Sequence, residues 1–182
     1  DLLEIGITLA SAREIYRKLS PLVEDYPLLA ARAGEIRPLT HVIDEIRRCL
    51  DDDGQVVDAA SPELARLRRE IFSAKERLLE RLRRLVSDPT TSRYLQEPIV
   101  TERNGRYVIP LKIEHRGRIP GLVQDQSSSG ATLFIEPLAT VELNNRWHEL
   151  QIAERHEVAR ILRALSELVG AEADNIINNV RL

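Results

Sequence analysis

A run of three serines stands out as the stretch that could do chemistry. In the segment VQDQSSSGATLFIEP, Ser127, Ser128 and Ser129 precede a glycine, with His115 and Asp125 nearby in sequence. A GxxxxGK[ST] phosphate loop is excluded, because no glycine of the chain is followed by lysine. A serine nucleophile needs a base beside it, and its typical GxSxG elbow motif does not surround these serines. Two main interpretations stay open: a polar turn between strands, or a loop that hydrogen-bonds phosphate. A distant third, a serine nucleophile, would need a base within about 3 Å of a hydroxyl.

The residue types that bind metals are scattered along the chain. Cys49 is far in sequence from most of the four histidines, and no histidine belongs to an HxxxH pair with carboxylate support. The acidic turn at 51–55 has neither the alternation nor the closing glutamate of a calcium loop. The sequence therefore predicts no metal and no cofactor within this chain. The histidines are His41, His115, His148 and His156.

Basic side chains gather in two places. The stretch KIEHRGR carries Lys112, Arg116 and Arg118 against one acid, Glu114, and the segment 61–86 carries eight basic residues against four acidic ones. A charged helix face is commonly just solvated. A basic loop on a small β-rich head is where a contact to a phosphate backbone would be expected.

Composition limits the class of protein. The 182 residues carry a net charge of -3, so nucleic-acid contact would need a local patch. The single cysteine favours a reducing, cytoplasmic setting, no apolar run approaches the roughly 18 residues of a membrane span, and no signal peptide is visible. A chain that starts at Asp1 and lacks methionine is expected to be a piece of a longer protein.

Helical periodicity dominates both ends of the chain. Apolar residues recur at steps of three and four in 2–19. A second helix is expected from Leu22 to Ala33, interrupted near Pro27 and closed by Gly34, and Pro38 can open a third. Ser61 and Pro62 begin a long helix to Val86, whose apolar seam averages 3.5 residues per step, the coiled-coil period. Its seam residues are Leu64, Leu67, Ile71, Ala74, Leu78, Leu82 and Leu85.

A similar seam returns after Pro137 and runs to Leu168, with only Glu154 out of character. Glu154 could pair with an arginine of the other long helix, mark a kink, or indicate that the register is off by one.

The sequence pattern in the middle of the chain predicts β-strands. Two β-prone arms flank Asn104-Gly105, which is the strongest short signal for a hairpin. Further strands are expected at 119–123 and 131–135, with Pro110 and Pro120 at edges or bulges. The predicted fold is mainly α with a small antiparallel β insertion (α+β): two long antiparallel, coiled-coil-like helices that carry a β head.

The expected division has three parts. Residues 1–60 form a helical core segment, 61–88 and 137–182 the lever helices, and 89–136 a β-rich clamp head.

One family resembles this pattern closely. The stretches SPELARLRREI and LQEPIVTERNGRYVIPLKIEHRGRIPGLVQDQSSSGATLFIEPLATVELNN, with the helix that follows, resemble the MutS-two family, the second class of bacterial MutS-like proteins. Residues 1–58 resemble the helical segment before the lever of that family, and the last stretch, NIINNVRL, is left unassigned.

The resemblance implies a larger parent protein. That parent would be a dimeric ATPase with helical core, levers, clamp and a C-terminal Smr nuclease domain, linked to restraining recombination at branched DNA and to rescuing collided ribosomes. This chain would be the core, lever and clamp portion. ATP and Mg would belong to the ATPase domain, outside it.

The leading prediction is a non-catalytic module that grips nucleic acid. Lys112, Arg116 and Arg118 would contact phosphate, and the three serines could add hydrogen bonds. The alternative is a structural coiled-coil module for dimerisation or for docking to protein.

Overall fold

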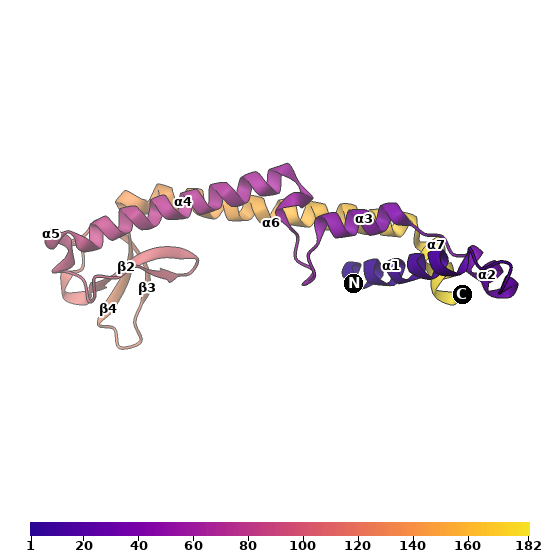
Figure 1. Cartoon of the computed structure of the whole chain (residues 1–182). Helices are drawn as coiled ribbons and strands as arrows, with labels where there is room; N and C mark the ends of the chain where they lie inside the picture. Colours follow the sequence, from indigo (N-terminus) through magenta and orange to yellow (C-terminus); the bar gives the residue numbers. More distant parts are fainter. The chain divides into compact units, whose positions relative to one another are not determined.

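The computed structural model describes all 182 residues and contains seven α-helices and one four-stranded antiparallel sheet (Figure 1). The expected class, mainly α with a small antiparallel β insertion, is confirmed. The chain divides into two compact units, Asp1–Ala65 with His156–Leu182 (unit 1) and Arg66–Arg155 (unit 2). No helix combines the length and the apolar composition needed to cross a membrane.

Unit 1 is built from helices around an aliphatic core. It contains α1 (Leu2–Leu19), α2 (Pro27–Gly34), α3 (Thr40–Cys49), the short 3-10 helix η1 (Asp58–Ala60) and α7 (Ala173–Arg181), together with parts of α4 (Pro62–Ser87) and α6 (Val141–Ala171). Its core consists of Leu9, Val42, Ile43, Ile46, Leu50, Val56, Leu64, Ile161 and Leu165 with their small neighbours.

Local chemistry explains where these helices begin. Asp1 and Glu4 form a capping box at the start of α1. Two predicted starts shift: α2 begins only at Pro27, which suits a first helical position, and α3 begins at Thr40 because Leu39 has a left-handed φ of 43°. The acidic turn closes as expected, with Gly54 at a φ of 76°.

Unit 2 joins the sheet to parts of the two long helices. Its elements are α5 (Pro89–Ser92), β1 (Thr101–Arg103), β2 (Arg106–Lys112), η2 (Ile113–His115), β3 (Gly121–Gln126), β4 (Thr132–Pro137) and η3 (Leu138–Thr140), with the adjoining parts of α4 and α6. The strand order is β1-β2-β4-β3, and every pairing is antiparallel. The predicted hairpin turn is confirmed, because Asn104 and Gly105 both have positive φ, 52° and 72°.

The expectation that Pro110 lies at an edge or a bulge is wrong, because Pro110 lies within β2, an interior strand of the sheet. β1 pairs with β2 only as far as Val108. Beyond that point the segment before β1 takes over, and Gln96 N donates to Pro110 O at 2.8 Å. A residue's nitrogen and carbonyl face the same neighbour in an antiparallel ladder, so the donor that proline lacks faces this irregular segment, and the ladder between β2 and β4 is not interrupted.

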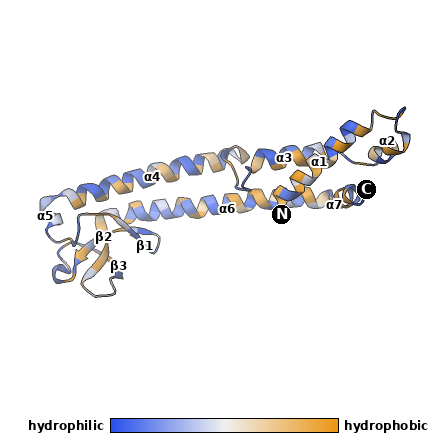
Figure 2. Ribbon diagram, turned by 60° about the horizontal axis from the view of Figure 1, so that its bottom comes forward, coloured by the Kyte–Doolittle hydropathy of each residue, from blue (hydrophilic) through white to orange (hydrophobic).

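One face of the sheet packs on the helices of unit 2. Strand residues such as Ile109 and Ile135 share a core with Leu78 and Leu82 of α4 and with Trp147 of α6. Figure 2 shows hydrophobic and hydrophilic residues alternating along both helices, as amphipathic helices require.

The two long helices run antiparallel within unit 2 and are joined by ion pairs. Glu154 pairs with Arg68 of α4 at 2.8 Å, and Arg146 pairs with Glu70 at 3.0 Å. The charge that interrupted the apolar seam is therefore explained by the first of the three alternatives, an arginine of the other helix.

Candidate functional site

The basic connection between β2 and β3 begins at one end of the sheet and ends at the other. Lys112 ends β2 opposite Thr132, and η2 and a turn at Gly117 follow, where φ is 82°. Lys112 is half-buried, whereas Arg116 and Arg118 are exposed. None of these three cations lies within ion-pair distance of a carboxylate. The same is true of several arginines on α4, whereas other arginines of the chain are paired.

The serine run forms the turn between β3 and β4. Gly130 N donates to Ser127 O at 2.8 Å, and Ser127 N donates to Thr132 O at 2.9 Å. The Ser127 hydroxyl accepts from Thr132 N at 3.1 Å and lies 3.3 Å from the Ser129 hydroxyl, while Ser128 is exposed. Two of the three hydroxyls therefore close the turn itself.

The groups that could activate a serine are engaged elsewhere. The His115 ring packs edge-on against Tyr94, with centroids 5.0 Å apart. Asp125 pairs with Arg103 at 3.4 Å. Neither side chain hydrogen-bonds a serine hydroxyl, so the nucleophile–base geometry is not formed at this turn.

The predicted contact residues fall into two groups. Ile113 N donates to Ala131 O at 3.0 Å, which brings the start of the basic connection against the serine turn. The connection then crosses to the other end of β4, since Gly121 pairs with Pro137. Lys112 therefore lies beside the serines, and Arg118 lies toward the opposite end of the sheet.

Arg118 lies on a groove that the sequence did not reveal. The groove has a volume of about 530 Å³, and its lining includes Arg93, Tyr94, Pro120 and Leu138. The Arg93 guanidinium stacks on the Tyr94 ring at 4.6 Å and donates to the carbonyl of Thr90 at 3.2 Å. The one available signal was the Arg-Tyr pair that follows the long helix.

Asp88 caps the short helix α5, which leads into the groove. Asp88 accepts from the backbone N–H and the hydroxyl of Thr90, both at 2.9 Å. These bonds hold the pKa of the Asp88 carboxyl below its ordinary value. Asp88 therefore begins α5 and fixes the segment that carries Arg93.

A buried polar network ties the sheet to the start of α6. The fully buried Glu136 accepts from Arg106 and from Gln124, each at 2.7 Å. Asn144, also fully buried, accepts from Tyr107 N and donates to Tyr107 O, both at 3.0 Å. Sequence reasoning missed this network, because its partners are far apart along the chain.

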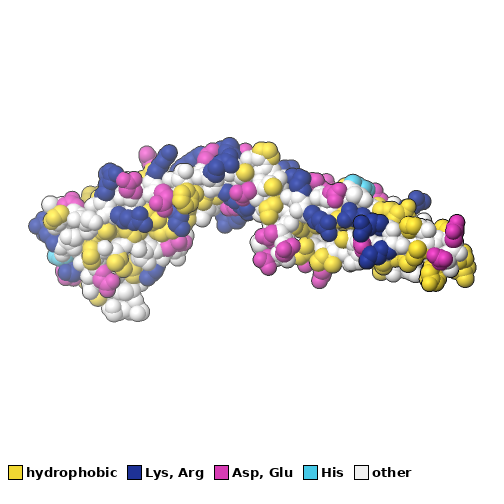
Figure 3. Space-filling model, in the orientation of Figure 1, with side chains coloured by type: hydrophobic (Ala, Val, Ile, Leu, Met, Phe, Trp, Pro, Cys, Tyr) yellow, Lys and Arg dark blue, Asp and Glu magenta, His cyan; other side chains and the backbone are white.

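The two units differ in charge. Unit 2 contains sixteen Lys and Arg against twelve Asp and Glu, a net charge of +4, whereas unit 1 contains ten against seventeen, a net charge of -7. Figure 3 shows basic side chains spread over α4 and around the sheet. The net charge of -3 for the whole chain thus conceals a basic sheet-bearing unit.

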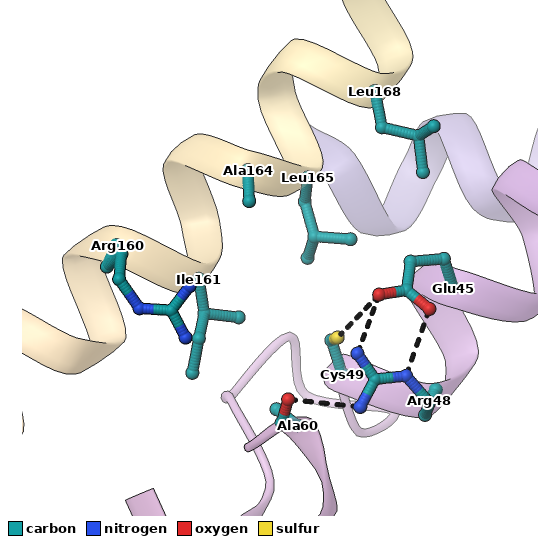
Figure 4. Close-up of a pocket in the computed structure, with 9 residues that line it drawn as sticks. All are labelled: Glu45, Arg48, Cys49, Ala60, Arg160, Ile161, Ala164, Leu165 and Leu168. Atoms are coloured by element: carbon teal, nitrogen blue, oxygen red, sulfur yellow. Dashed lines mark hydrogen bonds and ion pairs between the residues drawn. The ribbon is translucent and has the colours of Figure 1, made fainter. Parts of the chain in front are cut away.

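A small cavity in unit 1 holds the single cysteine beside an arginine and a glutamate (Figure 4). It has a volume of about 140 Å³ and lies beside Cys49, Arg48 and Glu45. Arg48 binds the Glu45 carboxylate at 2.6 and 2.9 Å and the carbonyl of Ala60 at 3.0 Å. Burial raises the pKa of the Cys49 thiol, which keeps it protonated and unreactive at neutral pH.

No group of three or more His, Cys, Asp or Glu side chains is placed to hold a metal ion. The arrangement that stands out is therefore the exposed cations of unit 2.

Comparisons with known proteins extend the resemblance to the whole chain. Endonuclease MutS2 of Symbiobacterium thermophilum is 46% identical over 181 residues, which is 100% of this chain and 23% of that protein. The proteins of the same name from Pelotomaculum thermopropionicum and Alkaliphilus oremlandii are 45% and 41% identical over 97% and 98% of this chain. No family model matches. The chain thus spans about a quarter of the length of the curated relatives it matches.

Proposed function

The chain belongs to the MutS2 family and corresponds to a segment of its full-length members. From this premise we propose that the chain grips nucleic acid by its phosphate backbone and catalyses no reaction. The contact is made by unit 2, through Lys112, Arg116 and Arg118. The observation that carries the proposal is that unit 2 has a net charge of +4 and places these three cations on one short connection without a carboxylate partner, a lack that they share with several arginines of α4 and of unit 1. A cation that already has an internal partner must give it up to bind phosphate, whereas these three need not.

The serine turn adds hydrogen bonds at the Lys112 end of this surface. Ser128 is exposed, and it lies beside the point where the basic connection leaves β2. Hydroxyl and backbone N–H groups of this kind contact phosphate oxygens without reading the bases. The interaction is accordingly one of charge and position, with little dependence on sequence.

The long helices act as levers in this proposal. α4 and α6 contribute to both units, and the ion pairs Arg68–Glu154 and Arg146–Glu70 join them within unit 2. Such cross-helix pairs resist sliding of one helix along the other. A movement applied to the helices is then passed to the sheet, which supports the division into core, levers and clamp.

We propose that the full-length parent is a cytoplasmic, homodimeric ATPase that binds branched DNA or ribosomal RNA and acts in recombination suppression or ribosome rescue. ATP and Mg bind outside this chain. The word endonuclease in the relatives' name supports a nuclease domain in the parent.

A second candidate function is a structural module that docks to protein. Unit 1 favours it, because this unit has a net charge of -7 and exposes apolar side chains, among them Leu28 at 86% and Val180 at 65%. Contacts through these apolar side chains would be nearly insensitive to salt, unlike contacts to phosphate.

The test is a binding titration of the chain with plain duplex DNA, branched DNA and ribosomes across a salt series. Three phosphate contacts predict that log K falls with log salt with a slope of about -2.7, or roughly -0.9 for each contact. A slope near zero with all three partners would contradict the phosphate grip and favour the docking module.

A further inference from the structure

We infer that the groove beside Arg118 is a binding site for one unpaired nucleotide of DNA or RNA. The inference rests on the proposed function, and it adds the class of nucleic acid that unit 2 prefers. Its basis is the combination in one groove of an apolar floor, two cationic side chains and no acidic residue.

The floor of the groove is apolar and preformed. It includes Leu85, Ile119, Pro120 and Leu138, and the Leu138 side chain is 56% exposed. Leu138 N donates to Pro120 O at 3.0 Å, so a backbone hydrogen bond joins the two chain segments that carry these residues. A flat apolar group can enter without rearranging the backbone.

The rim of the groove is cationic. The Arg93 guanidinium stacks on the Tyr94 ring, and its Nε donates a hydrogen bond to the carbonyl of Thr90. Its two terminal nitrogens make no hydrogen bond within the protein and are available to a phosphate. Arg118 is exposed and has no carboxylate partner. Both arginines line the same groove, and a guanidinium suits a bidentate hold on phosphate oxygens.

The apolar floor distinguishes an unpaired nucleotide from a paired one. In a duplex the phosphates face outward and the base faces are stacked, so a duplex could use the cations but not the floor. An unpaired nucleotide offers its base face to apolar and aromatic side chains and its phosphate to arginine. The volume of about 530 Å³ is within the range of about 300–1,000 Å³ usual for small-ligand sites.

The test compares three probes with the full chain: a plain DNA duplex, the same duplex with a single-stranded flap, and an RNA hairpin with an unpaired loop. A 2-aminopurine in the flap reports on the stacking of that base. The wild-type chain should bind the flap probe, the RNA hairpin or both roughly tenfold more tightly than the plain duplex, as one stacked base would give. The preferred probe identifies the source of the nucleotide.

Leu138→Asn places a polar amide on the apolar floor at an exposed position and adds no charge beside Arg118. It should abolish the preference and the 2-aminopurine signal, while affinity for the plain duplex stays within about twofold. Ile99→Asn is the matched control: Ile99 is 47% exposed in the same unit and does not line the groove. It should leave the preference intact.

Two failures can be told apart. Equal affinity for all three probes in the wild type, or a preference that survives Leu138→Asn, would overturn this inference and leave the phosphate grip standing. Loss of salt-dependent binding to every probe would overturn the proposed function and this inference with it.

Discussion

Asn144 offers the sharpest test of how the sheet is anchored. Its side chain is fully buried and makes two hydrogen bonds of 3.0 Å to the backbone of Tyr107 in β2. Asn144→Ala removes both and leaves a donor and an acceptor of Tyr107 without partners. At about 1–2 kcal/mol for each group, unit 2 should lose about 2–4 kcal/mol of unfolding free energy.

The neighbouring asparagine supplies a matched control. Asn145 is exposed and accepts one hydrogen bond, from Arg106 at 2.8 Å. Asn145→Ala should cost less than about 1 kcal/mol, because water replaces the lost partner.

Hydrogen exchange and denaturant unfolding together measure the effect of the two changes. The Tyr107 amide should exchange roughly 30-fold to 1,000-fold faster in Asn144→Ala, since each 1.4 kcal/mol is about a factor of ten. A variant as stable as Asn145→Ala, with the Tyr107 amide equally protected, would refute the anchoring role of Asn144.

Two further predictions concern stability. Hydrogen bonds from Arg160, and then from the Ser61 hydroxyl, lower the pKa of Glu157 from 4.5 to about 2. A carboxyl whose pKa is lowered in the folded state stabilises the fold above pH 4.5, so the unfolding free energy of unit 1 should fall as pH falls from 4.5 toward 2. Denaturation series at several pH values should show this loss, and Glu157→Gln should flatten it. An unchanged profile in Glu157→Gln would contradict it. Gly121→Ala should destabilise unit 2 by about 1–3 kcal/mol in denaturant unfolding, because its Cβ would lie 2.7 Å from Glu136 O; wild-type stability would show that β3 can shift.

The features that the sequence predicted well are local. Asn104-Gly105 forces a hairpin through its own backbone preferences, and Ser61-Pro62 begins a helix through its own capping chemistry. Such signals depend on residues within a turn or two of each other. The helical seams are local in the same sense, which is why the mainly α class with a β insertion was confirmed.

The features that the sequence did not predict depend on contacts between distant residues. The groove brings Arg93, Arg118 and Leu138 together from three separate segments, and no spacing along the chain encodes that meeting. Glu154 shows the intermediate case: the periodicity located an anomalous charge, but only the packed helices identify Arg68 as its partner. The helix α3 begins at Thr40 and not at Pro38, because the backbone of Leu39 is in the left-handed conformation.

The placement of the candidate contact residues follows the same distinction. Adjacent strands bring Lys112 and the serine turn together. Arg118 is only six residues further on, but the connection carries it toward the other end of β4. Whether these residues touch phosphate stays a prediction.

The most direct test of the central claim is charge reversal with a matched control. The triple variant Lys112→Glu, Arg116→Glu and Arg118→Glu is compared with a triple in unit 1 that changes the net charge equally. The control changes are Arg47→Glu, Arg163→Glu and Arg181→Glu, at exposed positions without carboxylate partners.

Binding to duplex and branched DNA and to ribosomes is measured across a salt series. The account predicts that the unit 2 triple flattens the salt slope by about 2.7, while the control triple leaves the slope near that of the wild type. Equal slopes in the wild type and the unit 2 triple, or the same flattening in both variants, would contradict a phosphate contact at Lys112, Arg116 and Arg118.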